Sequence, residues 1–367
     1  MSWFSAGDSV SEAAVLAALK VVQDPDLHRD IVSLGFVKNL KIDGGRVAFT
    51  IELTTPACPV KDQMQAQARA AVAALPGVRD VTVDMTASVR SAIAPDAGRA
   101  PMPGIRNIIA VGAGKGGVGK TTVAVNLAIS LAQRGSRVGI IDGDIYGPNV
   151  PIMLGVQQPL THDGQKITPA RGHGIDAVSM GFLTDADSPV IWRGPMLHGV
   201  IQQFFRDVRW PELDYLVIDM PPGTGDVALS LSQTVPVSGA IVVTTPQTVS
   251  LADTKRAVRM YQKLNIPTLG LVENMSHFVC PGCGRESDIF GKGGGEKLAE
   301  EMDVPFLGRI PLYEPIRVGS DNGTPIVVAE PASPAGKAIL AVAEQAAAQI
   351  SIKSFGQKRT IPLVPVQ

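Results

Sequence analysis

Residues Gly114 to Thr121 read Gly-Lys-Gly-Gly-Val-Gly-Lys-Thr, the pattern of a phosphate-binding loop. The apolar run Ile108–Val111 precedes this stretch, and a helical pattern begins at Thr122. A glycine-rich loop between a strand and a helix turns backbone N–H groups toward phosphate oxygens, and the helix N-terminus adds a partial positive charge. The sequence therefore predicts that the chain binds a nucleoside triphosphate.

The residues of this loop have different predicted roles. We expect Lys120 to reach the β and γ phosphates and the Thr121 hydroxyl to coordinate Mg²⁺, which neutralises phosphate charge during transfer. The predicted nucleotide-binding set is the loop with the residue that follows it, namely Gly114, Lys115, Gly116, Gly117, Val118, Gly119, Lys120, Thr121 and Thr122.

Carboxylates follow two further apolar runs. Asp219 ends the run that begins at Tyr215 and precedes Met-Pro-Pro-Gly-Thr-Gly, so we expect it to hold Mg²⁺ together with Thr121. Asp142 and Asp144 follow the other run. Hydrolysis needs an acceptor near the attacking water that does not itself hold the metal, and Asp144 is the candidate for this role. The sequence leaves Asp142 as an alternative.

The second lysine of the loop, Lys115, needs a separate explanation. It does not easily reach its own β and γ phosphates while Lys120 occupies them. A charge supplied to the nucleotide of a second subunit would explain it, because such a residue stabilises transition-state charge in trans. The sequence thus predicts a functional homodimer in which Lys115, Lys120 and Asp144 are the catalytic residues.

The order of predicted elements indicates an α/β chain with two domains. Residues 1–91 contain a helix over 9–22, strands over 34–42 and 46–53 around the hairpin signal Asp43-Gly44-Gly45, a helix over 60–75 and a strand over 78–85. This small α+β domain is followed by an Ala/Pro/Gly-rich linker, 92–104, and by alternating strands and helices over 105–350. That alternation is typical of a doubly wound, mainly parallel sheet, here of the P-loop NTPase type. Residues 351–367 are predicted to be a tail without a helical stripe.

Composition excludes several classes of function. The formal net charge of −1 over 367 residues indicates no general nucleic-acid binding. The first sixteen residues include Asp8 and Glu12, which argues against a secretory signal, and no apolar run is long enough to span a membrane. Three cysteines are too few for a disulfide framework. We therefore expect a cytoplasmic protein that does not bind membranes.

Cys280-Pro-Gly-Cys283 is the second functional signal. Two cysteines at this spacing form a turn whose thiolates converge on one ion, and a soft metal centre needs about four such ligands. Two copies of the pair across a two-fold axis would suit a [4Fe–4S] cluster. The remaining ligands could instead come from Cys58 or from a nearby histidine. The alternatives to a cluster are an intrachain zinc site of Cys280, Cys283 and His277 and a redox-active dithiol.

Residues of the nucleotide site together resemble the deviant Walker A group of P-loop ATPases over about residues 105–345. This resemblance implies that Lys115 crosses the dimer interface, that Asp144 activates water and that Asn274, after the predicted strand over 268–272, reads the adenine edge. An asparagine here is also a common turn residue.

The Lys115 loop, Asp219-Met-Pro-Pro-Gly-Thr-Gly-Asp226 and Cys280-Pro-Gly-Cys283 are similar to the Mrp family within that group. The family implies an ATP-hydrolysing homodimer that shares a labile [4Fe–4S] cluster through the paired cysteines and passes it to apo iron–sulfur proteins. The first ninety or so residues resemble a small domain of cytosolic iron–sulfur assembly factors, through motifs that include Leu53-Thr-Thr-Pro-Ala-Cys58-Pro59. Cys58 lies just before a predicted helix, where the helix dipole favours thiolate, so it is a candidate for cluster transfer.

The sequence therefore favours an ATP-dependent iron–sulfur cluster carrier with ATP, Mg²⁺ and a [4Fe–4S] cluster as cofactors. The alternative is a ParA/MinD-like positioning ATPase with a structural zinc knuckle, which would need a membrane-binding helix or a basic surface. A reductase like the nitrogenase iron protein does not match, because its cluster cysteines lie far apart in the sequence.

Overall fold

The computed structural model describes residues 10–93, 102–144, 147–156, 160–182, 194–223, 226–280 and 282–356, with the backbone alone at 194–198, 226, 227 and 230. The chain divides into two compact units, Met1–Arg90 and Ser91–Gln367. Among the described residues, no helix is both long and apolar enough for a membrane span.

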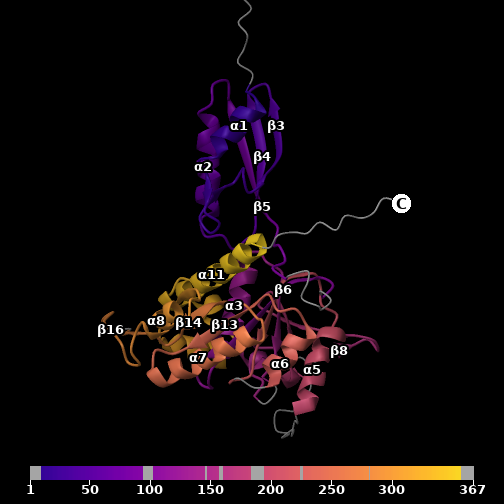
Figure 1. The fold of residues 1–367 in the computed structure, drawn as a ribbon, viewed down its shortest axis with the longest axis vertical. Coiled ribbons are helices and arrows are strands. Elements are labelled where there is room, and N and C mark those ends of the chain that lie inside the picture. Colours follow the sequence, from indigo (N-terminus) through magenta and orange to yellow (C-terminus); the bar gives the residue numbers. More distant parts are fainter. Residues whose placement is uncertain are drawn as a thin grey trace, which may run out of the picture. The chain divides into compact units, whose positions relative to one another are not determined.

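The first unit is a three-stranded sheet with two helices (Figure 1). The sheet order is β3-β4-β5, with β3 antiparallel and β5 parallel to β4. Alternate residues of β4 are buried, which is the pattern of a strand with one face on a core. In chain order the elements are α1 (Glu12–Leu19), β1 (Gln23–Asp24), β2 (Arg29–Asp30), β3 (Val37–Asp43), β4 (Arg46–Leu53), α2 (Lys61–Ala73) and β5 (Asp80–Ala87).

The hairpin predicted at Asp43-Gly44-Gly45 is confirmed. Asp43 pairs with Arg46, and the two glycines between them have φ values of 51° and 88°. Two positive φ values in a two-residue loop match the twist of the flanking strands, and glycine adopts them at no steric cost.

Several predicted boundaries in this unit differ from the structure, and two of the differences have a clear local cause. The first strand begins at Val37 rather than at residue 34, because the Asp30 carboxylate accepts the N–H groups of Val32 and Ser33 and holds a turn that closes at Gly35, whose φ is 70°. The first helix begins at Glu12 rather than at residue 9, and Ser11 caps it by accepting the N–H of Ala14.

The second unit is built on an eight-stranded sheet in the order β10-β11-β7-β12-β6-β13-β14-β17. Every pairing is parallel except that of β10 with β11. Its elements are β6 (Ile105–Ala113), α3 (Lys120–Gln133), β7 (Val138–Asp142), α4 (Val150–Met153), β8 (Thr161–His162), β9 (Ile167–Thr168), β10 (Ala170–Gly172), β11 (Ile175–Val178), α5 (Gly194–Arg206), β12 (Leu213–Asp219), α6 (Asp226–Thr234), β13 (Gly239–Thr244), α7 (Thr248–Lys263), β14 (Thr268–Glu273), β15 (Phe278–Val279), β16 (Glu286–Ser287), α8 (Gly294–Glu301), β17 (Phe306–Arg309), α9 (Glu314–Asp321), α10 (Ile326–Ala329) and α11 (Pro334–Gly356).

Helices cover both faces of this sheet (Figure 1). α3 and α11 pack together on one face, and α5, α6, α7 and α8 pack on the other. The fold is therefore the predicted doubly wound, mainly parallel α/β sheet, which places the carboxyl ends of β6, β7, β12, β13 and β14 along one edge. The sequence prediction missed β10, β11 and β17, which are short and lie toward the two ends of the sheet.

The predicted start of the tail at residue 351 was wrong. Helix α11 continues to Gly356, because its buried stripe extends through Ala346 and Ile350, and Ser351 is only 3% exposed. Residues 357–367 lie outside the described part of the chain. So does most of the predicted linker, although the N–H of Ala92 donates to the Asn107 side chain in β6.

Candidate functional site

The loop between β6 and α3 has the backbone shape that a phosphate-binding loop requires. Gly117 and Gly119 have φ values of 80° and 82°, which side chains with a Cβ rarely adopt. Gly119 is the N-cap of α3, so the N-terminus of this helix opens directly onto the loop. Thr122 lies half-buried in the first turn. The loop therefore has the strand and helix context that the sequence predicted.

Neighbouring elements press closely against the back of this loop. A Cβ on Gly114 would lie 2.3 Å from the carbonyl carbon of Asp253 in α7. A Cβ on Gly119 would lie 2.3 Å from the Nδ2 atom of Asn274, and that nitrogen donates a 2.8 Å hydrogen bond to the carbonyl oxygen of Val118. Asn274 thus contacts the loop backbone directly, and its contact with adenine stays a prediction.

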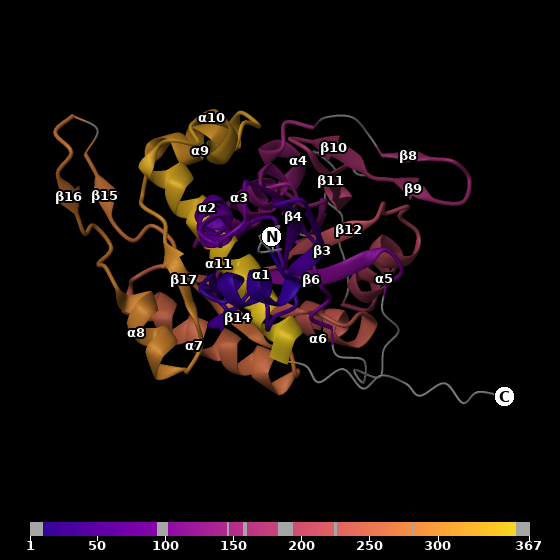
Figure 2. The same cartoon turned by 90° about the horizontal axis from the view of Figure 1, so that it is seen from above.

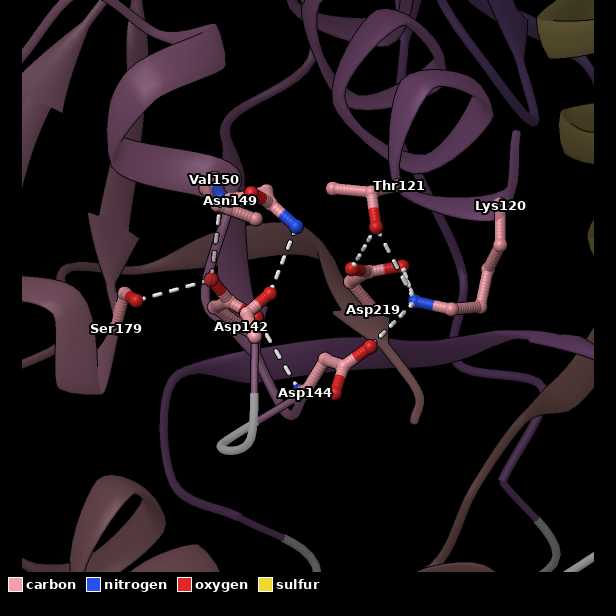
Figure 3. Close-up of polar contacts among 9 residues, drawn as sticks. Lys120, Thr121, Asp142, Asp144, Asn149, Val150, Ser179 and Asp219 are labelled. Carbon is pink, nitrogen blue, oxygen red and sulfur yellow. Dashed lines mark hydrogen bonds and ion pairs between the residues drawn. The ribbon is translucent and has the colours of Figure 1, made fainter. Parts of the chain in front are cut away.

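Three charged or polar side chains meet at the mouth of the loop (Figure 3). Lys120 Nζ lies 2.6 Å from Asp219 Oδ1, and Thr121 Oγ1 donates to Asp219 Oδ2 at 2.7 Å. Asp219 is fully buried at the end of β12, and burial raises the pKa of its carboxyl while Lys120 opposes the rise. The residues after this strand include Thr224 and Gly225, which lie outside the described residues.

The two aspartates after β7, which the sequence left as alternatives for orienting water, have different surroundings (Figure 3). The Asp142 carboxylate accepts from the N–H groups of Val150 and Asp144 and from the Ser179 hydroxyl. Burial, together with the charge of Asp219, raises the pKa of Asp142 to about 7. Its carboxylate is therefore occupied in holding this part of the chain together.

Asp144 instead turns its carboxylate toward the nucleotide loop. Its Oδ2 atom lies 3.9 Å from Lys120 Nζ, and the side chain is 18% exposed. Burial raises the pKa of this carboxyl and Lys120 lowers it. Two carboxylates beside one lysine, together with the Thr121 hydroxyl, offer the hard oxygen donors that Mg²⁺ prefers.

Lys115 lies apart from this cluster. The side chain is half-buried and takes part in no ion pair in the described ranges. Among the described residues, no carboxylate therefore neutralises its ammonium group, which is what the predicted role in trans would require.

The cysteine pair lies at the end of a hairpin, β15–β16, that projects from the rest of the second unit (Figure 2). β15 and β16 pair antiparallel, and the turn between them is closed by bonds from Cys280 N to Arg285 O and from Gly284 N to Cys280 O. Gly284 has a φ of 71°. Cys280 is half-exposed and Cys283 exposed, so both thiols are accessible.

Backbone groups of the turn stabilise the Cys280 thiolate. The N–H of Gly282, followed by the N–H and the side chain of Cys283, lowers the pKa of Cys280 below its usual value. A thiolate is the form that binds soft metals. The lowered pKa therefore favours the form of Cys280 that binds a soft metal.

We expect Cys283→Ala to raise the pKa of Cys280, because one of the three groups that stabilise the thiolate is lost while the two N–H donors remain. Iodoacetamide alkylation of Cys280, followed by peptide mass spectrometry across pH, measures the midpoint. The wild-type midpoint should lie below that of an unperturbed cysteine, about 8.5, and the variant should lie between the two. An unchanged midpoint in the variant would contradict this account of the turn.

The structure does not support the intrachain zinc site. Within the described ranges, no three His, Cys, Asp or Glu side chains come together as ligands of one ion, so His277 does not join Cys280 and Cys283. Cys58 belongs to the first unit, where it is half-buried just before α2. The pair therefore lacks further ligands from the described residues of its own chain.

Sequence reasoning missed Glu273, which ends β14 and is fully buried. Its carboxylate accepts the N–H groups of Gly293 and Gly295 and the hydroxyl of Ser276. The available signal was an acidic residue at the end of an apolar strand, upstream of the glycine run 293–295.

The fold and the loop define the class of protein as a P-loop NTPase, and residues 104–347 match a family model described as NUBPL iron-transfer P-loop NTPase. Residues 12–85 match a second family model, described as iron–sulfur cluster assembly protein. The chain belongs to this iron-transfer P-loop NTPase family, and the predicted Mrp resemblance is confirmed.

Relatives with high sequence identity are described as iron–sulfur cluster carriers or assembly factors. An iron–sulfur cluster carrier protein of Synechocystis sp. is 51% identical over 349 residues, which cover 93% of this chain and 98% of the relative. One of Deinococcus radiodurans is 49% identical over 94% of this chain and 97% of its own. A chloroplastic Fe–S cluster assembly factor of Arabidopsis thaliana is 46% identical over 90% of this chain and 63% of its own.

Solved structures resemble the second unit. A nucleotide-binding protein from Archaeoglobus fulgidus in complex with ADP is 36% identical with a TM-score of 0.56, over 64% of this chain and 92% of its own. The cell division ATPase MinD of Pyrococcus furiosus is 29% identical with a TM-score of 0.52, over 65% of this chain and 97% of its own.

Proposed function

We propose that the protein is an ATP-binding and ATP-hydrolysing iron–sulfur cluster carrier. It acts as a cytoplasmic homodimer, holds a [4Fe–4S] cluster between the Cys280–Cys283 pairs of its two subunits and transfers the cluster to apo iron–sulfur proteins. Cluster assembly factors supply the cargo. The observation that carries the proposal is the exposed thiol pair on the same chain as a complete phosphate-binding loop.

ATP binding is supported by the geometry of the loop. The N-terminus of α3 and the backbone N–H groups of the glycine run would provide donors for phosphate oxygens. Lys120 is fixed at the loop mouth, where its ammonium would neutralise the terminal phosphates. The nucleotide complex of the Archaeoglobus relative is consistent with this reading.

The residues at the loop mouth fit Mg²⁺. Thr121 and Asp219 already lie within hydrogen-bond distance of each other, and both offer oxygen atoms. These two residues would hold the ion. Mg²⁺ supplies charge neutralisation on the β and γ phosphates.

The roles in hydrolysis divide between the two subunits. Asp144 accepts the proton of the attacking water or orients it, since its carboxylate is turned to the loop mouth while that of Asp142 is occupied by three donors. Lys115 extends to the nucleotide of the partner subunit. There its charge stabilises the transition state, as an arginine finger does in related enzymes.

Cargo binding requires two subunits. One hairpin offers two thiolates, and a four-iron cluster takes about four cysteine ligands. Two-fold symmetry brings identical surfaces together, so one axis through the hairpins completes the ligand set. Cys58 is proposed as a transfer thiol that receives or passes on iron or cluster.

Anaerobic reconstitution with iron and sulfide tests the proposal. We expect about four iron and four sulfide ions per dimer, with the absorption of a cubane cluster. A zinc ion bound within each monomer, with no acid-labile sulfide, would contradict it. Co-sedimentation with liposomes or DNA in the presence of ATP tests the alternative of a positioning ATPase, and we expect none.

A further inference from the structure

The two ends of the cysteine hairpin are attached to a single carboxylate. Ser276 precedes β15 and donates to Glu273 Oε1 at 2.6 Å. Gly293 and Gly295, beyond β16, donate their N–H groups to Oε1 and Oε2 at 2.9 and 2.6 Å. A Cβ on Gly295 would lie 3.0 Å from the Cβ of Glu273, so the N-terminus of α8 fits tightly against this side chain. Glu273 therefore fixes where the chain leaves β14 for the hairpin and where it enters α8 after the hairpin.

The next residue along the chain is attached to the phosphate-binding loop. Asn274 donates to the carbonyl oxygen of Val118, and the methyl carbon of Met275 lies 3.7 Å from the position of a Cβ on Gly119. Met275 has a φ of 53°, a left-handed conformation that is uncommon for a methionine. The backbone bonds that hold this turn include Asn274 N to Thr244 O and Ser276 N to Ile310 O.

A short rigid path thus joins the two functional regions. It runs from the backbone of Val118 through Asn274 and the backbone to Glu273, and from its carboxylate to both ends of the hairpin. Glu273 is 0% exposed and all three of its donors are fixed, so a displacement of the strand end moves the whole hairpin base. Packed elements with discrete arrangements are the physical basis of coupling between sites.

We infer that Glu273 is a positioning residue that transmits nucleotide binding at the phosphate loop to the cysteine pair. The inference rests on the proposed function for its nucleotide and its cargo. It adds the route between them: nucleotide shifts the Val118 backbone, Asn274 follows it, and Glu273 carries the shift to the base of the hairpin. The two sites then bias one conformational equilibrium.

Glu273→Gln is the test variant because it preserves shape and removes part of the attachment. A glutamine has one acceptor oxygen, so its NH₂ group would face one of the glycine N–H groups. Glu296→Gln is the matched control. Arg309 pairs with both residues, its Nε atom lying 3.7 Å from Glu273 Oε1 and its guanidinium pairing with Glu296. Glu296 lies in the first turn of α8, is 44% exposed and makes none of the three bonds to the hairpin base.

The readout is the alkylation rate of Cys280 and Cys283 in the full-length, metal-free protein, with and without Mg²⁺ and a non-hydrolysable ATP analogue. Cys58, in the other unit, is the internal reference thiol. In the wild type and in Glu296→Gln we expect the analogue to change the alkylation rate of Cys280 and Cys283, relative to that of Cys58, by about fivefold or more. In Glu273→Gln the change should fall below about twofold, with analogue affinity unchanged.

Two results would overturn the inference. One is a wild-type ratio that does not respond to the analogue. The other is an equal response in Glu273→Gln, which would mean that a partner subunit simply covers the thiols. If Glu273→Gln does not fold, Ser276→Ala is the second variant, because it removes only one of the three bonds to Glu273. The analogue should then change the alkylation ratio by less than in the wild type, and a change as large as in the wild type would also contradict the inference. Failure of the wild type to load iron and sulfide would defeat the proposed function but leave this thiol assay readable.

Discussion

Mixing Lys115→Ala subunits with Asp144→Asn subunits is expected to restore ATP hydrolysis that neither variant has alone. Each homodimer should lose about 10³-fold in kcat, because it lacks either the transition-state charge or the residue that orients water. In a mixed dimer the nucleotide of the Lys115→Ala subunit has its own Asp144 and receives Lys115 from the partner. That one site is complete.

The fraction of ATP hydrolysis that returns on mixing shows whether Lys115 acts in the partner subunit. Equal mixing gives half mixed dimers with one complete site of two, so about one quarter of wild-type activity should return. Phosphate release measured across mixing ratios, after exchange of subunits, gives the curve. Activity that stays at the level of the separate variants would show that Lys115 acts within its own subunit. Asp142→Asn mixed with Lys115→Ala is a useful comparison, because Asp142 is engaged with Val150 and Ser179 instead of the loop mouth.

Replacement of either Cys280 or Cys283 by alanine is expected to abolish cluster retention and leave nucleotide binding intact. A dimer of either variant has two thiolates at the hairpins where a four-iron cluster takes about four, so iron and sulfide after anaerobic reconstitution should fall to about a tenth of wild type or less. The cysteines are accessible and lie outside the hydrophobic core, so the substitutions should not change the fold. Iron and sulfide counts, together with the ATP dissociation constant, measure both parts.

Cys58→Ala is the matched control for this experiment. It removes one thiol from the other unit, and we expect full cluster loading with at most a slower transfer to an apoprotein. Retention of the cluster by both hairpin variants would defeat the model in which two subunits share it. Loss of the cluster in Cys58→Ala alone would move the ligand set to the first unit.

The local features of the nucleotide site could be predicted from the sequence because they depend on residues close together in the chain. A glycine run with Lys120 and Thr121 has one common use between a strand and a helix, and Asp219 ends an apolar run. The hairpin at Gly44 and Gly45 likewise follows from local backbone preference.

Other features required the packed structure. Whether Asp142 or Asp144 is free to act depends on Val150 and Ser179, and Ser179 follows β11, which the sequence did not indicate. Helix α11 packs against β14, β17 and α3, and its buried residues continue through Ser351, past the end that the sequence indicated.

The sequence by itself determined the class of fold and the phosphate-binding loop, and it singled out Asp219 as a predicted magnesium ligand and Cys280 and Cys283 as a predicted pair of soft ligands. Each is a short pattern whose chemistry is independent of distant residues. Only the tertiary structure decided that Glu273 connects both ends of the cysteine hairpin and that its neighbour Asn274 holds the phosphate loop. The reason is physical: these bonds form between segments that meet only because the order of strands in the sheet brings the end of β14 beside them.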